Sequence, residues 1–89
     1  MVKKEITIVN KLGLHARAAA KFVTMASVFE SEIHLAKGDR MVNGKSIMGV
    51  MMLAAAKGTH LEVIAHGKDE AEAVVMLAEL VEKRFGEDE

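Results

Sequence analysis

Residues 33–43, IHLAKGDRMVN, carry the pattern that decides the fold. Ile33 and Leu35 alternate with polar neighbours, which is the period of two expected of a half-buried strand. Residues 37–40, KGDR, have turn chemistry, and the chain becomes apolar again at residues 41–43, MVN. The stretch therefore predicts a β-hairpin.

Two elements precede this hairpin. Residues 2–9, VKKEITIV, alternate apolar and polar side chains and predict a strand. Residues 16 to about 28 predict an amphipathic helix, because apolar side chains recur there at i, i+3, i+4 and i+7. The stripe consists of Ala19, Phe22, Val23 and Ala26.

A short helix and a strand follow the hairpin. Ser46 is a favoured N-cap residue ahead of IMGVMMLAAAKG, and Gly58 is a residue type that ends helices, so we expect a second helix between them. Its inward stripe is expected to consist of Ile47, Val50 and Ala54. A fourth strand is predicted next, from the alternation of Leu61, Val63 and Ala65.

The last predicted element is a third helix. Residues 69–72, DEAE, predict a capping-box-like start in which Asp69 caps the helix and Glu72 reaches back. Glu79 and Lys83 have the i,i+4 spacing of an ion pair. The buried stripe is expected to be Val74, Leu77, Ala78 and Val81.

The order of these elements is β-α-β-β-α-β-α. It predicts an α+β fold, an open-faced β-sandwich in which a four-stranded antiparallel sheet carries three helices on one face. The 89 residues suffice for one domain, residues 1–89, and the acidic end GEDE at residues 86–89 is expected to fray.

Composition excludes several function classes. A net charge of −1 and the absence of Trp and Tyr argue against nucleic acid as a partner. Zero cysteines exclude disulfides and thiolate metal sites and fit a cytoplasmic protein. The chain has no signal-peptide pattern and no apolar run long enough for membrane insertion, so we expect a cytoplasmic location.

Residues 10–23, NKLGLHARAAAKFV, place His15 and Arg17 at the predicted start of the first helix. A helix start has unpaired backbone N–H groups and partial positive charge, which suit a phosphate. Gly13 permits a tight turn, and Arg17 can reach the same anion. Neutral imidazole is nucleophilic near pH 7, so His15 could accept a phosphoryl group without a separate base. The helix dipole and Arg17 are expected to disfavour its imidazolium form.

Ordinary structural roles are the alternatives for these residues. His15 could simply cap a helix and Arg17 could be a solvated surface residue, because the spacing G-x-H-x-R is short. Ser46 could be a plain N-cap. Met48 and Met51 could belong to the core, although a two-turn helix that buries its inward stripe leaves them outward as an adaptable docking patch. The other histidines, His34, His60 and His66, lack metal-ligand spacing, so no metal site is predicted.

Two long motifs resemble those of the HPr phosphocarrier family of the bacterial phosphotransferase system. GLHARAA at residues 13–19 is similar to the family's histidine motif, and KSIMGVMMLAAAKGT at residues 45–59 to its serine-site helix. The resemblance implies that His15 is phosphorylated through Nδ1 with Arg17 assisting, that the backbone N–H groups of Ala16 and Arg17 hold the phosphate, and that Ser46 is a regulatory phosphorylation site.

The resemblance also implies the partners. Enzyme I, charged by phosphoenolpyruvate, would phosphorylate His15, and enzyme IIA domains would receive the group for sugar uptake. A serine kinase/phosphorylase would act on Ser46. The chain would be a monomeric, cofactor-free stoichiometric carrier and not an enzyme. Its partner docking residues would be Ala20, Thr24, Ile47, Met48 and Met51.

Two residues depart from the family pattern. Ala18 stands where the family usually has proline, which removes some local rigidity. Leu12 stands where many members have a small polar residue near the phosphate. Two rival functions stay open: a carrier in a regulatory, nitrogen-type phosphorelay, and a non-phosphorylated interaction module that docks through Met48 and Met51.

Overall fold

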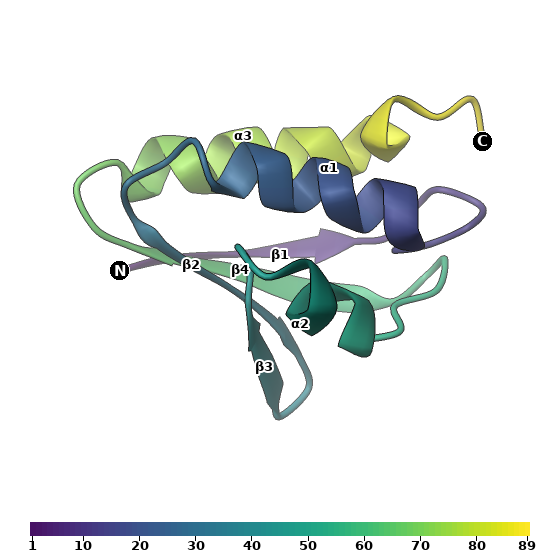
Figure 1. Ribbon diagram of the computed structural model, residues 1–89, viewed down its shortest axis with the longest axis horizontal. Coiled ribbons are helices and arrows are strands. Elements are labelled where there is room, and N and C mark those ends of the chain that lie inside the picture. Colours follow the sequence, from purple (N-terminus) through teal and green to yellow (C-terminus); the bar gives the residue numbers. More distant parts are fainter.

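The computed structural model describes residues 1–89 and confirms the predicted order of strands and helices (Figure 1). A short 3₁₀ turn follows the last helix. The elements are β1 (Val2–Thr7), α1 (Ala16–Ala26), β2 (Glu32–Lys37), β3 (Arg40–Asn43), α2 (Ile47–Met52), β4 (His60–His66), α3 (Glu70–Glu82) and η1 (Arg84–Gly86).

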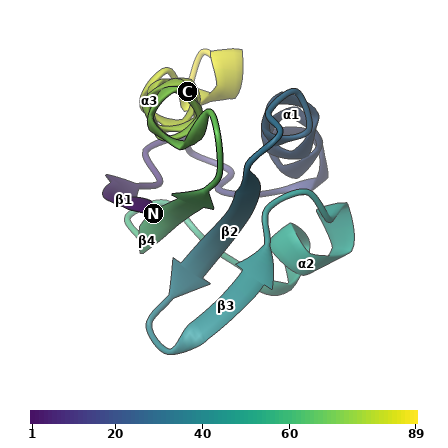
Figure 2. The ribbon, with the colours of Figure 1, turned by 90° about the vertical axis from the view of Figure 1, so that its left-hand side faces the viewer.

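The four strands form one antiparallel sheet in the order β1-β4-β2-β3. The central strand β4 pairs Ala65 with Val2 of β1 on one side and with Ile33 of β2 on the other. The helices cover one face of this sheet, with α3 over β1 and β4, α1 over β2 and α2 beside β3 (Figure 2). The structure thus has the predicted open-faced sandwich architecture.

The core lies between the sheet and the helices. It includes the predicted stripes of α1 and α3, in which only Val23 is partly exposed, and all three phenylalanines, Phe22, Phe29 and Phe85. The opposite face of the sheet is mostly polar, and there Thr7 of β1 and His60 of β4 form a hydrogen bond of 3.0 Å. None of the helices combines the length and apolarity needed to cross a bilayer.

α2 is shorter than predicted. It ends at Met52, and the backbone N–H of Ala54 donates to the carbonyl oxygen of Met51 at 3.0 Å. Ala54 then takes a left-handed backbone conformation with φ of 49°, and this bend buries Leu53 and Ala55. Burial of these two side chains thus ends the helix before Gly58, a tertiary effect that local propensity does not contain.

The predicted inward stripe of α2 is correspondingly wrong in two of its three members. Val50 is fully buried, but Ile47 is 40% exposed and Ala54 is exposed as well. Met48 and Met51 face outward, with 70% and 41% of their surfaces exposed. The outer side of α2 therefore presents Ile47, Met48 and Met51 to solvent.

The start of α3 is not a capping box. Asp69 occupies the N-cap position but makes no capping bond, and Glu72 is exposed. Asp69 instead accepts hydrogen bonds from the backbone N–H and the hydroxyl of Ser31, at 3.0 and 2.5 Å, and from the N–H of Glu30. The residue that reaches back is Glu70, which accepts from the N–H of Gly67 at 3.1 Å. Asp69 therefore joins the loop before β2 to the loop before α3.

The bonds to Asp69 predict a pH-dependent stability. The Ser31 hydroxyl and the Glu30 N–H hold the pKa of the Asp69 carboxyl below its ordinary value of 3.8. Because a lowered pKa stabilises the fold only while the carboxyl is ionised, this contribution is complete above about pH 4 to 5 and is lost as the pH falls through the folded pKa. We expect Asp69→Asn to lower the melting temperature at pH 7 by roughly 5 °C or more.

The measurement is thermal unfolding followed by circular dichroism at pH 7 and near pH 3, with Asp39→Asn as the matched control. Asp39 is an exposed carboxyl in the β2–β3 turn, so its variant should melt like the wild type. If Asp69→Asn destabilises equally at both pH values, the ionised carboxylate is not the stabilising species.

The sequence predicts that the C-terminal residues 86–89 fray, but in the structure they are hydrogen-bonded to the rest of the fold. Arg84 and Phe85 take left-handed backbone conformations, with φ of 57° and 55°, and reverse the chain after α3. Burial of Phe85, which is 1% exposed, compensates for this unfavourable backbone. The carbonyl of Phe85 also accepts a hydrogen bond of 2.7 Å from Nζ of Lys21 on α1. The tail consequently returns to the loop between β1 and α1 (Figure 1).

Candidate functional site

A tight turn sets the start of α1. Gly13 has φ of +69°, and a Cβ added to it would lie 2.5 Å from the carbonyl oxygen of Ala55, so only glycine fits. The backbone N–H of Leu14 donates to the same oxygen at 2.9 Å. Asn10 is completely buried, and its Nδ2 closes the turn by donating to the carbonyl of Gly13 at 2.8 Å. The turn is thereby fixed against the loop that follows α2.

His15 is the N-cap residue of α1, as predicted. No side chain caps this helix, so the N–H groups of its first turn, which includes Ala16 and Arg17, have no partner within the helix. The first turn contains no acidic residue either. The helix start therefore keeps the donors and partial positive charge that an anion requires.

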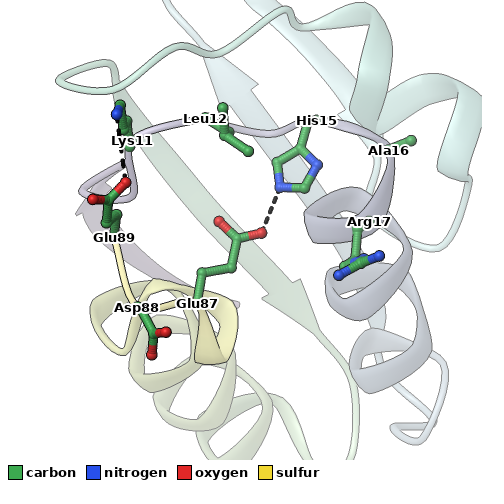
Figure 3. Close-up of a pocket in the computed structure, with 8 residues that line it drawn as sticks. All are labelled: Lys11, Leu12, His15, Ala16, Arg17, Glu87, Asp88 and Glu89. Atoms are coloured by element: carbon green, nitrogen blue, oxygen red, sulfur yellow. Dashed lines mark hydrogen bonds and ion pairs between the residues drawn. The ribbon is translucent and has the colours of Figure 1, made fainter.

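The imidazole of His15 is held by the returning tail. Its Nε2 lies 2.5 Å from Oε2 of Glu87 (Figure 3). The other carboxylate oxygen of Glu87, Oε1, accepts from Nδ2 of Asn10 at 2.9 Å. The other ring nitrogen, Nδ1, points toward the side of Ala16 and Arg17, away from Glu87 (Figure 3). The two nitrogens of one ring thus face different surroundings.

Glu87 is a carboxylate at neutral pH. Hydrogen bonds from Asn10 and then from His15 hold its pKa below the ordinary value of 4.5. An ionised carboxylate can only accept hydrogen bonds, so the short contact requires that Nε2 of His15 carries the hydrogen. In the neutral ring, the lone pair is then on Nδ1.

An open hollow of about 840 Å³ surrounds this histidine. Its lining residues are Lys11, Leu12, His15, Ala16, Arg17, Glu87, Asp88 and Glu89. Arg17 is exposed there and forms no ion pair, whereas Nζ of Lys11 lies 3.4 Å from Oε2 of Glu89. The tail therefore brings acidic groups to the same hollow, in addition to the helix start and Arg17 that the sequence predicts there. Leu12 is 67% exposed at its rim and provides no side-chain donor, and Ala18 is buried in the first turn of α1.

Ser46 is the N-cap of α2, where its Oγ accepts from the N–H of Gly49 at 3.2 Å. α2 lies beside α1 (Figure 2). The docking candidates divide between these helices: Ile47, Met48 and Met51 are exposed on α2, while Ala20 and Thr24 follow Arg17 along α1 and border an apolar groove toward α3.

The remaining histidines are apart from this site. His34, His60 and His66 lie on β2 and β4, on the sheet. No group of three metal-ligating side chains occurs in the structure.

Sequence reasoning missed two residues of the site, Asn10 and Glu87. Asn10 lies at the end of an alternating strand and resembles a surface loop residue, and Glu87 belongs to the stretch expected to fray. One signal for the tail exists in the sequence: Phe85 continues the buried stripe of α3 four residues after Val81, which indicates that the chain stays packed beyond the helix.

The fold and the site together define a class of protein: small α+β open-faced sandwiches with a histidine at a helix start that no side chain caps. A family model described as the PTS HPr component phosphorylation site matches residues 2–83. The phosphocarrier protein HPr of Neisseria meningitidis serogroup A is 58% identical over 89 residues, which covers 100% of both chains. The chain belongs to the HPr family of phosphocarrier proteins of the phosphotransferase system.

Solved structures show the same likeness. The crystal structure of HPr-C-His from Thermoanaerobacter tengcongensis has a TM-score of 0.96 at 47% identity and covers 100% of both chains. The crystal structure of an HPr dimer from the same organism has a TM-score of 0.78 at 48% identity and covers 98% of this chain and 100% of that one. The shared architecture agrees with the strand order derived above.

Proposed function

We propose that this chain is a stoichiometric phosphoryl carrier that accepts a phosphoryl group on Nδ1 of His15 from phosphorylated enzyme I and passes it to enzyme IIA domains that serve sugar uptake. The observation that carries the proposal is the arrangement of His15: Nε2 is bonded to Glu87, while Nδ1 faces the free end of α1 and Arg17. Family membership and the matched motif support the same assignment.

The site supplies what such a carrier requires. Neutral imidazole attacks phosphorus directly, and the first-turn N–H groups of Ala16 and Arg17 with the Arg17 guanidinium bind the anionic oxygens. The hollow is open to solvent, which leaves room for a large protein donor and a large protein acceptor in turn. Each transfer uses one carrier molecule, which returns to its starting state only by reaction with a partner protein. The carrier alone therefore turns over no substrate.

The direct test is incubation of the protein with enzyme I and labelled phosphoenolpyruvate, followed by a test of acid lability. We expect one equivalent of label that is lost in acid and stable in alkali, as for a phosphorus–nitrogen bond. Labelled protein should then transfer the group to a sugar-specific IIA domain. Absence of label would favour the non-phosphorylated interaction module, and transfer only to a nitrogen-type IIA domain would favour the regulatory phosphorelay.

Arg17 is expected to assist transfer without being essential. We expect Arg17→Ala to slow phosphorylation by enzyme I roughly tenfold, because the guanidinium makes charge-assisted bonds while the backbone donors remain. Single-turnover transfer assays in both directions measure this effect. The matched control is Arg40→Ala, since Arg40 is an exposed arginine at the start of β3, remote from His15 in sequence and fold. Wild-type rates in both directions for Arg17→Ala would contradict the assisting role.

The regulatory and docking parts of the proposal concern α2 and the outer side of α1. Ser46 is the proposed target of a serine kinase/phosphorylase, and Ala20, Thr24, Ile47, Met48 and Met51 are the proposed contacts for partner proteins. The exposure of the three α2 side chains supports this docking role. A cytoplasmic location and a monomeric state complete the proposal. A related HPr has been crystallised as a dimer, so the monomeric state is tested by measuring the mass of the protein in solution at the concentration used in the transfer assays.

A further inference from the structure

We propose that Glu87, held by Asn10, is a positioning residue for phosphoryl transfer: it fixes the hydrogen on Nε2 of His15 and stabilises the positive charge that the ring acquires when Nδ1 is phosphorylated. This inference rests on the proposed function of His15 as the phosphoryl acceptor. It gives a role to the C-terminal tail, which neither the resemblance nor the sequence pattern assigns.

Two hydrogen bonds link the side chains of Asn10, Glu87 and His15 in a row. Nδ2 of the fully buried Asn10 donates to Oε1 of Glu87 at 2.9 Å, and Oε2 of Glu87 accepts from Nε2–H of His15 at 2.5 Å. The other hydrogen of the Asn10 amide donates to the carbonyl of Gly13 at 2.8 Å, which ties the row to the turn that starts α1. Only 19% of the Glu87 side chain is exposed, so the carboxylate has little freedom to leave.

The electron and proton balance of the transfer explains why a carboxylate beside Nε2 of His15 favours phosphorylation at Nδ1. The Nδ1 lone pair forms a bond to phosphorus, while the bond between phosphorus and the donor breaks and its electron pair stays with the donor. No proton leaves the ring, because the only ring N–H is on Nε2. Both nitrogens then carry substituents and the ring becomes an imidazolium, whose charge lies next to Glu87. When the phosphoryl group leaves for an acceptor, the neutral ring returns without any proton transfer.

The neighbouring acidic residues do not share this position. The Asp88 side chain points away from the imidazole, and Glu89 lies beside Lys11 (Figure 3). A general effect of negative charge in the tail would involve all three side-chain carboxylates of residues 87–89, whereas the contact with the ring is made by Glu87 alone. Asp88→Asn is therefore a matched control, because it removes the same charge one residue away.

The test uses the full-length variants Glu87→Gln, Glu87→Ala and Asp88→Asn with phosphorylated enzyme I. We expect single-turnover transfer to be roughly tenfold slower in both directions for Glu87→Gln and Glu87→Ala, because a hydrogen bond to a charged group is replaced by a neutral one or by none. The KM for the carrier should stay unchanged, since the proposed docking residues are elsewhere. Asp88→Asn should transfer like the wild type.

Nuclear magnetic resonance of ¹⁵N-histidine-labelled protein supplies a readout of the contact itself. In the wild type and in Asp88→Asn, the Nε2–H proton of His15 should be visible and protected from solvent exchange. It should move upfield in Glu87→Gln and disappear in Glu87→Ala. Wild-type transfer rates in Glu87→Gln would overturn the proposal, even with a loss in Glu87→Ala, because packing of the tail and not its charge would then be the cause.

Failure of this inference is distinguishable from failure of the proposed function. If the Glu87 variants transfer normally while removal of His15 abolishes labelling, His15 is the carrier residue and Glu87 has no role in transfer. If label persists without His15, the proposed function fails whatever the Glu87 variants do.

Discussion

His15→Ala is expected to abolish phosphoenolpyruvate-dependent labelling of the protein by enzyme I. Alanine has no nucleophilic nitrogen, and the other three histidines lie on the sheet, away from the start of α1. The fold should persist, because removal of an N-cap side chain costs only ~0.5 to 2 kcal/mol and His15 makes no side-chain capping bond. The measurements are incorporation of acid-labile label and thermal unfolding.

His66→Ala is the matched control for this prediction. His66 is exposed at the end of β4, so its loss should leave both labelling and melting temperature at wild-type values. Residual acid-labile label on His15→Ala would assign the phosphoryl group to another histidine and would refute the role of His15. An unfolded variant would be recognised by its circular dichroism, and His15→Asn, which keeps polar volume at the cap, would then replace it.

The sequence predicts those parts of the fold that are controlled by local periodicity. One face of the sheet is buried and the other is wet, so the alternation around Ile33 and Leu35 defines both the strands and the inward face. The stripe of α3 follows the same logic with the helical period, and the Glu79–Lys83 pair forms at 2.9 Å as expected. Local pattern suffices where burial depends on a single repeat.

The errors have a common physical origin in long-range contacts. Asp69 is a residue type that commonly caps helices, but its carboxylate oxygens accept three hydrogen bonds from the loop before β2 instead of a bond from the helix start. α2 stops early because Leu53 and Ala55 are buried after it. The tail returns because Phe85 fills the core. Each partner is distant in sequence, so a window of neighbouring residues does not contain the competing interaction.

The candidate site was predictable in its centre and not in its surroundings. His15, Arg17 and the turn at Gly13 lie within five residues, so their proximity follows from the start of one helix. Glu87 reaches the ring from 72 positions away, and only after two left-handed residues reverse the chain. The sequence therefore places His15, Arg17 and the turn together at one helix start but does not indicate the carboxylate bonded to the same ring.

Ser46→Asp is expected to slow phosphorylation by enzyme I roughly 30-fold or more at low salt, because it places an unpaired charge at the edge of an apolar contact. Ile47, Met48 and Met51 follow Ser46 directly and are 40%, 70% and 41% exposed, so a partner that covers them would also desolvate the new carboxylate. A phosphate on Ser46 carries nearly two negative charges and should act in the same direction more strongly. Transfer rates at low and high salt measure the effect, which should shrink as salt screens it.

The same substitution should leave the free protein at least as stable as the wild type. Aspartate is as good an N-cap as serine, and negative charge at a helix start is worth ~0.3 to 1 kcal/mol; the lower end applies here because α2 has only six residues. The melting temperature should therefore be equal or slightly higher while transfer falls, and these opposite signs separate blocked docking from unfolding. Ser27→Asp is the control for the transfer rate, since Ser27 is an exposed serine at the C-terminal end of α1. Its own melting temperature should fall, because a negative charge there opposes the helix dipole. A Ser46→Asp protein that accepts phosphate at the wild-type rate in low salt would show that Ser46 is an ordinary helix cap and that the exposed methionines of α2 lie outside the contact with enzyme I.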